Sequence, residues 1–171
     1  MLASSLGYKS FKRPVIIMNM KSVITSSILF LLATSCHFYK EYDKKSFPTY
    51  SWKDAQEVIF SPTIDDKSKS YQITLGLRHL FALQLKEFDV NIKIVSPSGK
   101  ETSHDYNLKI RDESTKPIGS CAGDLCDLEA VIIATHRFEE EGEHKIVVSH
   151  NEDGYRIPGI MEVGLIIDEK D

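Results

Sequence analysis

The chain has 171 residues, of which 42% are hydrophobic and 27% are charged. All 25 acidic residues lie after residue 35, whereas only 17 of the 21 Lys and Arg residues do, so residues 36–171 carry a net charge of −8. Such an acidic body argues against a nucleic-acid-binding protein and against electrostatic adhesion to anionic lipid. A segment of this length is enough for one domain with a single core.

Residues 20–35 have the plan of a bacterial lipoprotein signal peptide. Lys21 supplies a positive charge, an apolar run follows from Val23 to Leu32, and small residues then lead to Cys36. The run is shorter than the ~20 residues that a membrane-spanning helix needs. An ordinary secretory signal would be cut at the same bond, and Ala33 stands where lipoprotein signals usually have Leu. Lipoprotein processing requires a thiol after the cut, however, so we predict that Cys36 carries diacylglycerol and palmitate and anchors the chain to a membrane.

Residues 1–19 do not fit this plan, because they contain Lys9, Lys12 and Arg13 and a helix-breaking Pro14. We expect translation to start at Met20 or Met18, which makes residues 1–19 a gene-model extension. The alternative is an unusually long positively charged region before the apolar run.

Residues 36–50 are polar and aromatic without a period, so we predict a tether there and a folded domain over residues 51–171. Apolar and polar residues alternate in three segments, which predicts half-buried strands, and Pro97-Ser98-Gly99 predicts a turn. Residues 81–88 are expected to form a short helix or a loop. The three alternating segments are residues 71–77, 90–94 and 106–110.

Residues 128–138 predict a longer strand, in which Val131-Ile132-Ile133 is buried on both faces or lies at a bend. The acidic, Gly-containing stretch after Phe138 predicts the turn of a hairpin that returns as the strand 145–148. A last strand is expected over residues 161–167. Many short strands without a long amphipathic helix favour an all-β fold, an antiparallel β-sandwich or jelly roll.

If Cys36 carries lipid, Cys121 and Cys126 remain as a pair. Their spacing is not C-x-x-C, and no His lies nearby to complete a zinc site. An exported compartment permits a disulfide between them, and two free thiols are the alternative. We therefore predict no metal site and no cofactor.

The sequence proposes no catalytic set. His136, His144 and His150 lie on or near adjacent predicted strands, so a cluster is conceivable, but structural or surface histidines are the simpler interpretation. Neither G-x-S-x-G nor H-E-x-x-H occurs, and there is no Gly-rich phosphate loop. The turn at residues 151–154 lacks the alternating oxygen positions of a calcium loop. A hydrolase would need a hidden triad, so we predict that the protein is not an enzyme.

Several segments, in their order and spacing, resemble one family, the gliding motility lipoprotein GldH of the Bacteroidota. The tail at residues 159–167 is the most specific of them, and the resemblance covers nearly all of the chain after Cys36. The departures are Cys121 and Cys126, which stand where a Gly-rich loop without cysteines is expected. The other carriers are Cys36 with Tyr39 and Tyr42, Trp52 ahead of Val58-Ile59-Phe60, residues 71–78, residues 97–100, and the expected hairpin Phe138…Gly142…His144.

The resemblance implies a non-enzymatic lipoprotein that supports gliding motility or type IX protein secretion through contacts with other proteins. It carries over no catalytic residue. We expect the contact surface at Trp52 and at Pro158-Gly159-Ile160, with core packing as the alternative for Trp52. No acidic cluster follows Cys36 directly, so we expect the outer membrane, facing the periplasm.

A carbohydrate-binding jelly-roll lipoprotein is the alternative function, because exposed aromatic side chains on a concave face can stack on sugars. The chain has a single Trp, which makes the stacking platform thin. The aromatic residues available for it are Tyr50, Trp52, Tyr71, Tyr106 and Tyr155.

Overall fold

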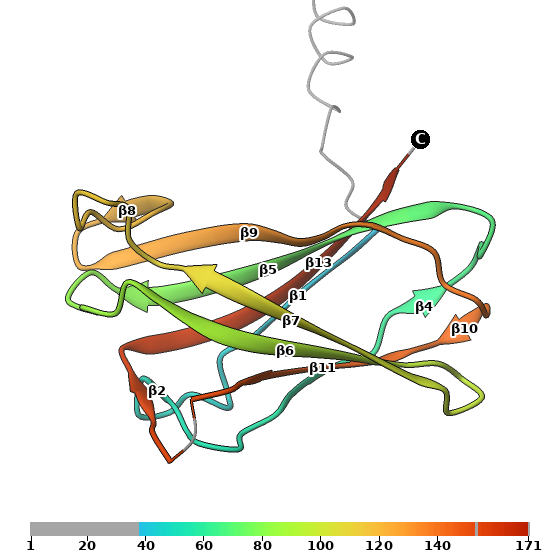
Figure 1. Ribbon diagram of the computed structural model, residues 1–171, viewed down its shortest axis with the longest axis horizontal. Helices are drawn as coiled ribbons and strands as arrows, with labels where there is room; N and C mark the ends of the chain where they lie inside the picture. The colour runs from blue at the N-terminus through green and yellow to red at the C-terminus, as the bar shows by residue number, and fades with distance from the viewer. Residues whose placement is uncertain (1–37, 153, 171) are drawn as a thin grey trace, which may run out of the picture. The chain divides into compact units, whose positions relative to one another are not determined.

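The computed structural model of the protein describes residues 38–152 and 154–170 (Figure 1). The described residues belong to one compact unit. Every regular element in the described part of the chain is a β-strand, which confirms the all-β prediction. Within those residues, no helix is long and apolar enough to cross a membrane.

Two antiparallel sheets form the domain, one with five strands and one with four. The five-stranded sheet has the order β1 (Tyr39–Asp43), β13 (Ile160–Lys170), β5 (Ser70–Leu80), β9 (Leu125–His136) and β8 (Ser120–Ala122). The four-stranded sheet has the order β3 (Val58–Phe60), β11 (Lys145–His150), β6 (Glu87–Val95) and β7 (Glu101–Lys109). Two short pairs complete the fold, β10 (Gly142–Glu143) with β4 (Thr63–Ile64) and β12 (Ile157–Pro158) with β2 (Ser51–Trp52).

The core lies between the two sheets and is built by the alternating residues that the sequence marks. The apolar side chains of β5 and β6 that alternate with polar ones are almost completely buried, because they point from the two sheets into the same layer. Burying one such side chain contributes about 1.5–3 kcal/mol. These residues are Tyr71, Ile73, Leu75 and Leu77 of β5 and Phe88, Val90, Ile92 and Ile94 of β6.

The predicted tether over residues 36–50 is wrong in part. Residues 39–43 form β1, which pairs with β13 from Tyr39↔Ile167 to Asp43↔Val163. Phe47, also inside the predicted tether, is buried against Trp52 with 6.0 Å between the ring centroids. Strand β1 gives no clear signal in the sequence, because an edge strand of five residues buries few of its side chains and so shows little alternation of apolar and polar residues.

Strand β9 bends where the sequence has Val131-Ile132-Ile133. Its register with β5 shifts twice, between the pairs Tyr71↔His136, Ile73↔Ile133 and Thr74↔Val131, so β9 holds one extra residue at each shift. Val131 is 44% exposed, so burial on both faces is wrong and the bend is right.

The predicted hairpin after Phe138 is also wrong. Strand β9 belongs to the five-stranded sheet and β11 to the four-stranded sheet, so the segment between them crosses the edge of the sandwich. On the way it forms β10, which pairs with β4. Phe138 is buried at the crossing, with ring centroids 5.3 Å from Tyr71, 4.6 Å from His136 and 4.8 Å from His144.

Residues 81–86 form a loop, and the strand β6 begins at Glu87. The predicted turn at residues 97–99 joins β6 to β7, with Gly99 at a φ of 87° and its N–H donating to the Ser96 carbonyl at 2.8 Å. Strand β7 starts at Glu101, earlier than its alternating residues indicated.

Candidate protein-contact surface

Cys36, the predicted lipidation site, lies outside the described residues, so its modification stays a prediction. The other predicted site residues all lie within them.

Trp52 belongs to the core and not to a contact surface. Its side chain is 0% exposed and stands edge-on to Phe88 at 6.1 Å and to His150 at 5.3 Å between ring centroids. The indole Nε1 donates to the Gln56 carbonyl at 3.0 Å, so its one polar group is satisfied. The core-packing alternative therefore holds.

The segment Pro158-Gly159-Ile160 is exposed only at Pro158. Ile160 is fully buried at the start of β13. Gly159 has a φ of 86°, a conformation that favours glycine, and its backbone binds both the end of β5 and the loop before β2. Its N–H donates to the Tyr50 carbonyl at 2.7 Å, and its carbonyl accepts from the Leu80 N–H at 2.8 Å. Gly159 and Ile160 thus position Pro158 and make no contact surface themselves.

Beside Pro158 lies an apolar hollow that we call the loop groove. It measures about 430 Å³ and runs between the loop at residues 81–86 and the segment that leads into β12. A second hollow of about 310 Å³ adjoins it and shares Leu83, Gln84 and Pro158 with it. Tyr155 and Leu85 are 73% and 37% exposed at its wall. The loop groove is lined by Leu83, Gln84, Leu85, Glu152, Tyr155, Arg156, Ile157 and Pro158.

Arg111 holds one wall of the loop groove in place. Its buried guanidinium donates to three backbone carbonyls, those of Leu83 at 2.7 Å, Phe81 at 2.6 Å and Thr115 at 2.5 Å. Two of those carbonyls belong to the loop, and hydrogen bonds from a charged donor contribute about 1.5–3 kcal/mol each. The planar guanidinium makes all three bonds at once, which a lysine ammonium at this position does not reproduce.

The hairpin of β8 and β9 contacts the same loop. Cys121 and Cys126 lie directly opposite each other in its register and are joined by a disulfide with an S–S distance of 2.04 Å. The Asp124 carbonyl at the hairpin tip accepts from the Phe81 N–H at 2.8 Å. The disulfide thus closes a small hairpin that contacts the groove loop.

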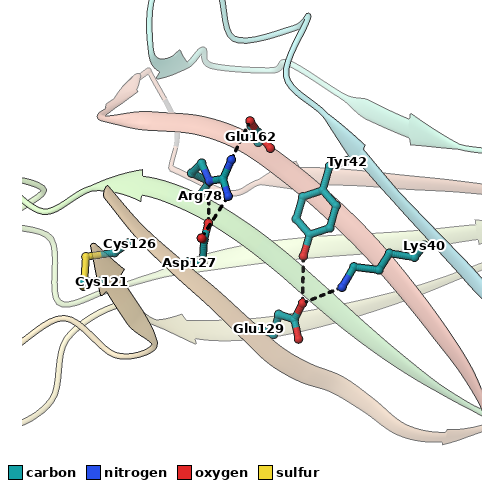
Figure 2. A network of polar contacts seen from close by, with 8 residues as sticks. All are labelled: Lys40, Tyr42, Arg78, Cys121, Cys126, Asp127, Glu129 and Glu162. Carbon is teal, nitrogen blue, oxygen red and sulfur yellow. Dashed lines mark hydrogen bonds and ion pairs between the residues drawn. A yellow bond between two sulfur atoms is a disulfide. The ribbon is translucent and has the colours of Figure 1, made fainter. Parts of the chain in front are cut away.

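The outer face of the five-stranded sheet carries a polar network (Figure 2). Tyr42 of β1 lies across Gly164 and Gly76, which face each other in the two central strands. The Tyr42 hydroxyl donates to Glu129 of β9 at 3.1 Å, and Lys40 reaches the same carboxylate at 3.1 Å. One row across four strands thus consists of Tyr42, Gly164, Gly76 and Glu129. The Tyr42 ring covers the two glycines, which have no side chains of their own.

Arg78 occupies the next row of that face. It binds Asp127 through two hydrogen bonds of 2.6 and 3.0 Å and Glu162 through one of 3.3 Å. The guanidinium lowers the pKa of Asp127 below its ordinary value. The pKa of Tyr42 is raised, first because the phenol is partly buried and then because of the Glu129 charge. These exposed pairs contribute little stability individually, and they keep the face polar.

The three histidines on adjacent predicted strands do not all come together. His136 and His144 both contact Phe138, whereas His150 lies against Trp52 and donates from Nε2 to the Lys53 carbonyl at 2.9 Å. Burial lowers the pKa of His136, and the neighbouring His104 and His144 lower it further. Among the described residues, no group of three or more His, Cys, Asp or Glu side chains is placed to hold a metal ion.

Only two of the five aromatic residues named for a sugar platform are strongly exposed. Trp52 and Tyr71 are buried, and the Tyr71 hydroxyl donates to the Asp66 carbonyl at 2.7 Å. Tyr106 of β7 is partly buried, and only Tyr50 and Tyr155 are strongly exposed. This arrangement does not favour a carbohydrate-binding surface.

Three features were not predicted from the sequence. Two belong to the loop groove, namely Arg111 and the leucines that line it. The third is the pair of glycines on the outer face of the five-stranded sheet. Arg111 gave no signal, because a lone Arg after a strand is usually solvated. Gly76 and Gly164 did give a signal in the sequence, since a glycine inside a strand often marks a place where another group approaches closely.

A family model described as GldH lipoprotein matches residues 38–167, which is most of the chain and nearly all of the described domain. A search of curated proteins finds no match for this chain.

Proposed function

The chain belongs to the GldH lipoprotein family, and we propose that it supports gliding motility or type IX protein secretion by contacting other proteins from a lipid anchor on Cys36. A lipoprotein family implies a membrane-anchored protein of the cell envelope. The proposal goes further in three respects: the lipid is on Cys36, the location is the outer membrane facing the periplasm, and the action is binding without catalysis.

The loop groove is the observation that supports this proposal best. An apolar hollow of about 430 Å³ bordered by exposed Leu85 and Tyr155 offers a place where an apolar side chain of another protein can be buried. Arg111 holds the wall formed by the loop at residues 81–86 through the backbone carbonyls of Phe81 and Leu83, so this wall is fixed by the fold. A preformed apolar site of this kind lowers the ordering cost of binding.

Complementation of a deletion strain tests the proposal. The variant Cys36→Ser tests the anchor, and Leu85→Asp with Tyr155→Asp tests the groove, because both groove side chains are exposed and their charges leave the core intact. The matched control is Ile59→Asp with Val131→Asp, which places two charges at exposed apolar sites on β3 and β9, 48% and 44% exposed, away from the groove. We expect the control variant to restore motility or secretion. The anchor variant and the groove variant should not restore it.

Full restoration by both the anchor variant and the groove variant would contradict the proposal. Immunoblots of membrane fractions must accompany each strain, because a variant that is absent from the cell reports on folding and not on contact.

A further inference from the structure

The loop groove lies at one end of the five-stranded sheet. The start of β1, which follows the lipid site directly in the chain, lies at the other end. Tyr39 at the start of β1 pairs with Ile167, near the end of β13. The groove lies where β13 begins, since Gly159 precedes Ile160 and its carbonyl accepts from the Leu80 N–H. Figure 1 shows the end of β13 and β2, the partner of β12, at opposite ends of that sheet. At about 3.4 Å per residue, Ile160–Ile167 spans roughly 20 Å or more.

Very little chain separates the lipid site from the sheet. Only His37 and Phe38 stand between Cys36 and β1, and the three steps from Cys36 to Tyr39 reach at most about 10 Å when fully extended. Phe38 packs against Tyr71 with 5.3 Å between the ring centroids, so it belongs to the domain and shortens this reach further. A lipid on Cys36 therefore holds the Tyr39 end of the sheet close to the membrane.

Two possible occupants of the groove are disfavoured by this geometry. The bilayer that holds the lipid lies at the other end of the sheet, and the residues between the lipid and β1 are too few to fold back over it. The outer face of the sheet is charged, with Lys40, Arg78, Asp127, Glu129 and Glu162 on it, so it does not sink into lipid to bring the groove nearer.

The chemistry of the groove indicates what fits it. Leu83, Leu85, Ile157 and Pro158 make an apolar floor and wall, and the adjoining hollow continues the same floor past Leu83. Two joined hollows accommodate successive side chains of an extended segment better than one compact ligand. Glu152 and Arg156 lie at the rim with opposite charges, so neither sign of charge is selected.

We propose that the loop groove faces away from the membrane that holds Cys36 and binds an extended apolar segment of a second protein in the aqueous compartment. The proposal rests on the lipid anchor of the proposed function and adds the direction and the chemistry of the contact.

The direction is tested with lipidated protein in phosphatidylcholine vesicles that contain a headgroup-attached quencher. A fluorophore is placed on Tyr155→Cys at the groove or on Lys67→Cys, an exposed position in the turn before β5 at the anchored end. Because Cys121 and Cys126 are bonded to each other and Cys36 carries lipid, the new thiol is the one available for labelling. We expect strong quenching of the fluorophore at position 67 and little quenching at position 155. Equal quenching at the two positions overturns the proposed direction.

The occupant is tested in intact cells with a photoreactive phenylalanine at Leu85 or, as the matched control, at Ile59. We expect an adduct from position 85 alone, in which mass spectrometry identifies an apolar segment of another protein. A lipid adduct, an adduct with a second copy of this chain, or equal adducts from both positions overturns the proposal. If the crosslinking result overturns the proposed occupant while the Cys36→Ser strain is inactive, the proposed anchoring function still stands. Failure of the groove proposal is thus distinguishable from failure of the proposed function.

Discussion

The pairing of Gly76 with Gly164 under Tyr42 makes a quantitative prediction about the outer face of the five-stranded sheet. A Cβ added at Gly76 would lie 2.5 Å from the Tyr42 hydroxyl oxygen and 2.7 Å from two ring carbons. These distances are too short for a real contact, so Gly76→Ala forces the ring off the sheet. The displaced ring loses its hydrogen bond to Glu129 and its packing on Gly164.

Overpacking of this kind costs about 1–3 kcal/mol, whereas Gly→Ala inside an unobstructed strand gains roughly 0.5–1 kcal/mol. We therefore expect Gly76→Ala to lower the free energy of unfolding by about 1–3 kcal/mol in the natural background and to be neutral or stabilising in a Tyr42→Ala background. The two effects give a coupling energy of about 1–4 kcal/mol between positions 42 and 76.

Urea unfolding of the four proteins of this double-mutant cycle, each made as residues 36–171 with Cys36→Ser, measures the coupling. If Gly76→Ala costs the same in both backgrounds, the Tyr42 ring does not occupy the space above the glycines and the reasoning fails.

Three further predictions concern the loops and the histidines. Cys121→Ala opens a loop closed by a sequence separation of 5, which is expected to cost about 2 kcal/mol in urea unfolding, and an unchanged midpoint would argue against the disulfide. Arg111→Lys should speed hydrogen exchange at residues 81–86 and lower stability by about 2 kcal/mol or more, since it cannot satisfy three carbonyls; unchanged exchange contradicts the assigned role. The pKa values of His79 and His136 lie below the ordinary value of 6.5, chiefly because of burial, so the unfolded chain binds protons first and stability falls as the pH is lowered through about 6.5. Thermal unfolding between pH 8 and pH 5 should show this fall, and His136→Phe should flatten it; an unchanged slope contradicts the assignment.

Much of the sandwich follows from local patterns. The alternation over residues 71–77 and 90–94 marks the central strands β5 and β6, because each has one face on the core and shows the period directly. The turn at residues 97–99 is marked by its own Pro and Gly.

The errors fall where tertiary contacts and not local pattern decide the structure. The segment after Phe138 has every mark of a hairpin, yet its strands go to different sheets, since Phe138 is buried between Tyr71 and His144 at the crossing. Strand β1 was missed because it is held by pairing with β13 and not by an apolar face of its own.

The candidate surface was predictable only at one residue. Pro158 lies at the loop groove, but Trp52 and Ile160 beside it are core residues, and sequence alone cannot tell a buried aromatic from an exposed one. The groove depends on Leu83 and Leu85, in a loop whose path is set by Arg111 from another part of the chain. Such a long-range contact leaves no periodic signal.

Intact-mass measurement of the mature protein, extracted from its own cells, tests directly whether Cys36 carries the anchor. We expect a membrane-bound protein whose first residue is Cys36, with a mass raised by diacylglycerol and an amide-linked acyl chain. A protein recovered in the soluble fraction with an unmodified Cys36 would contradict it.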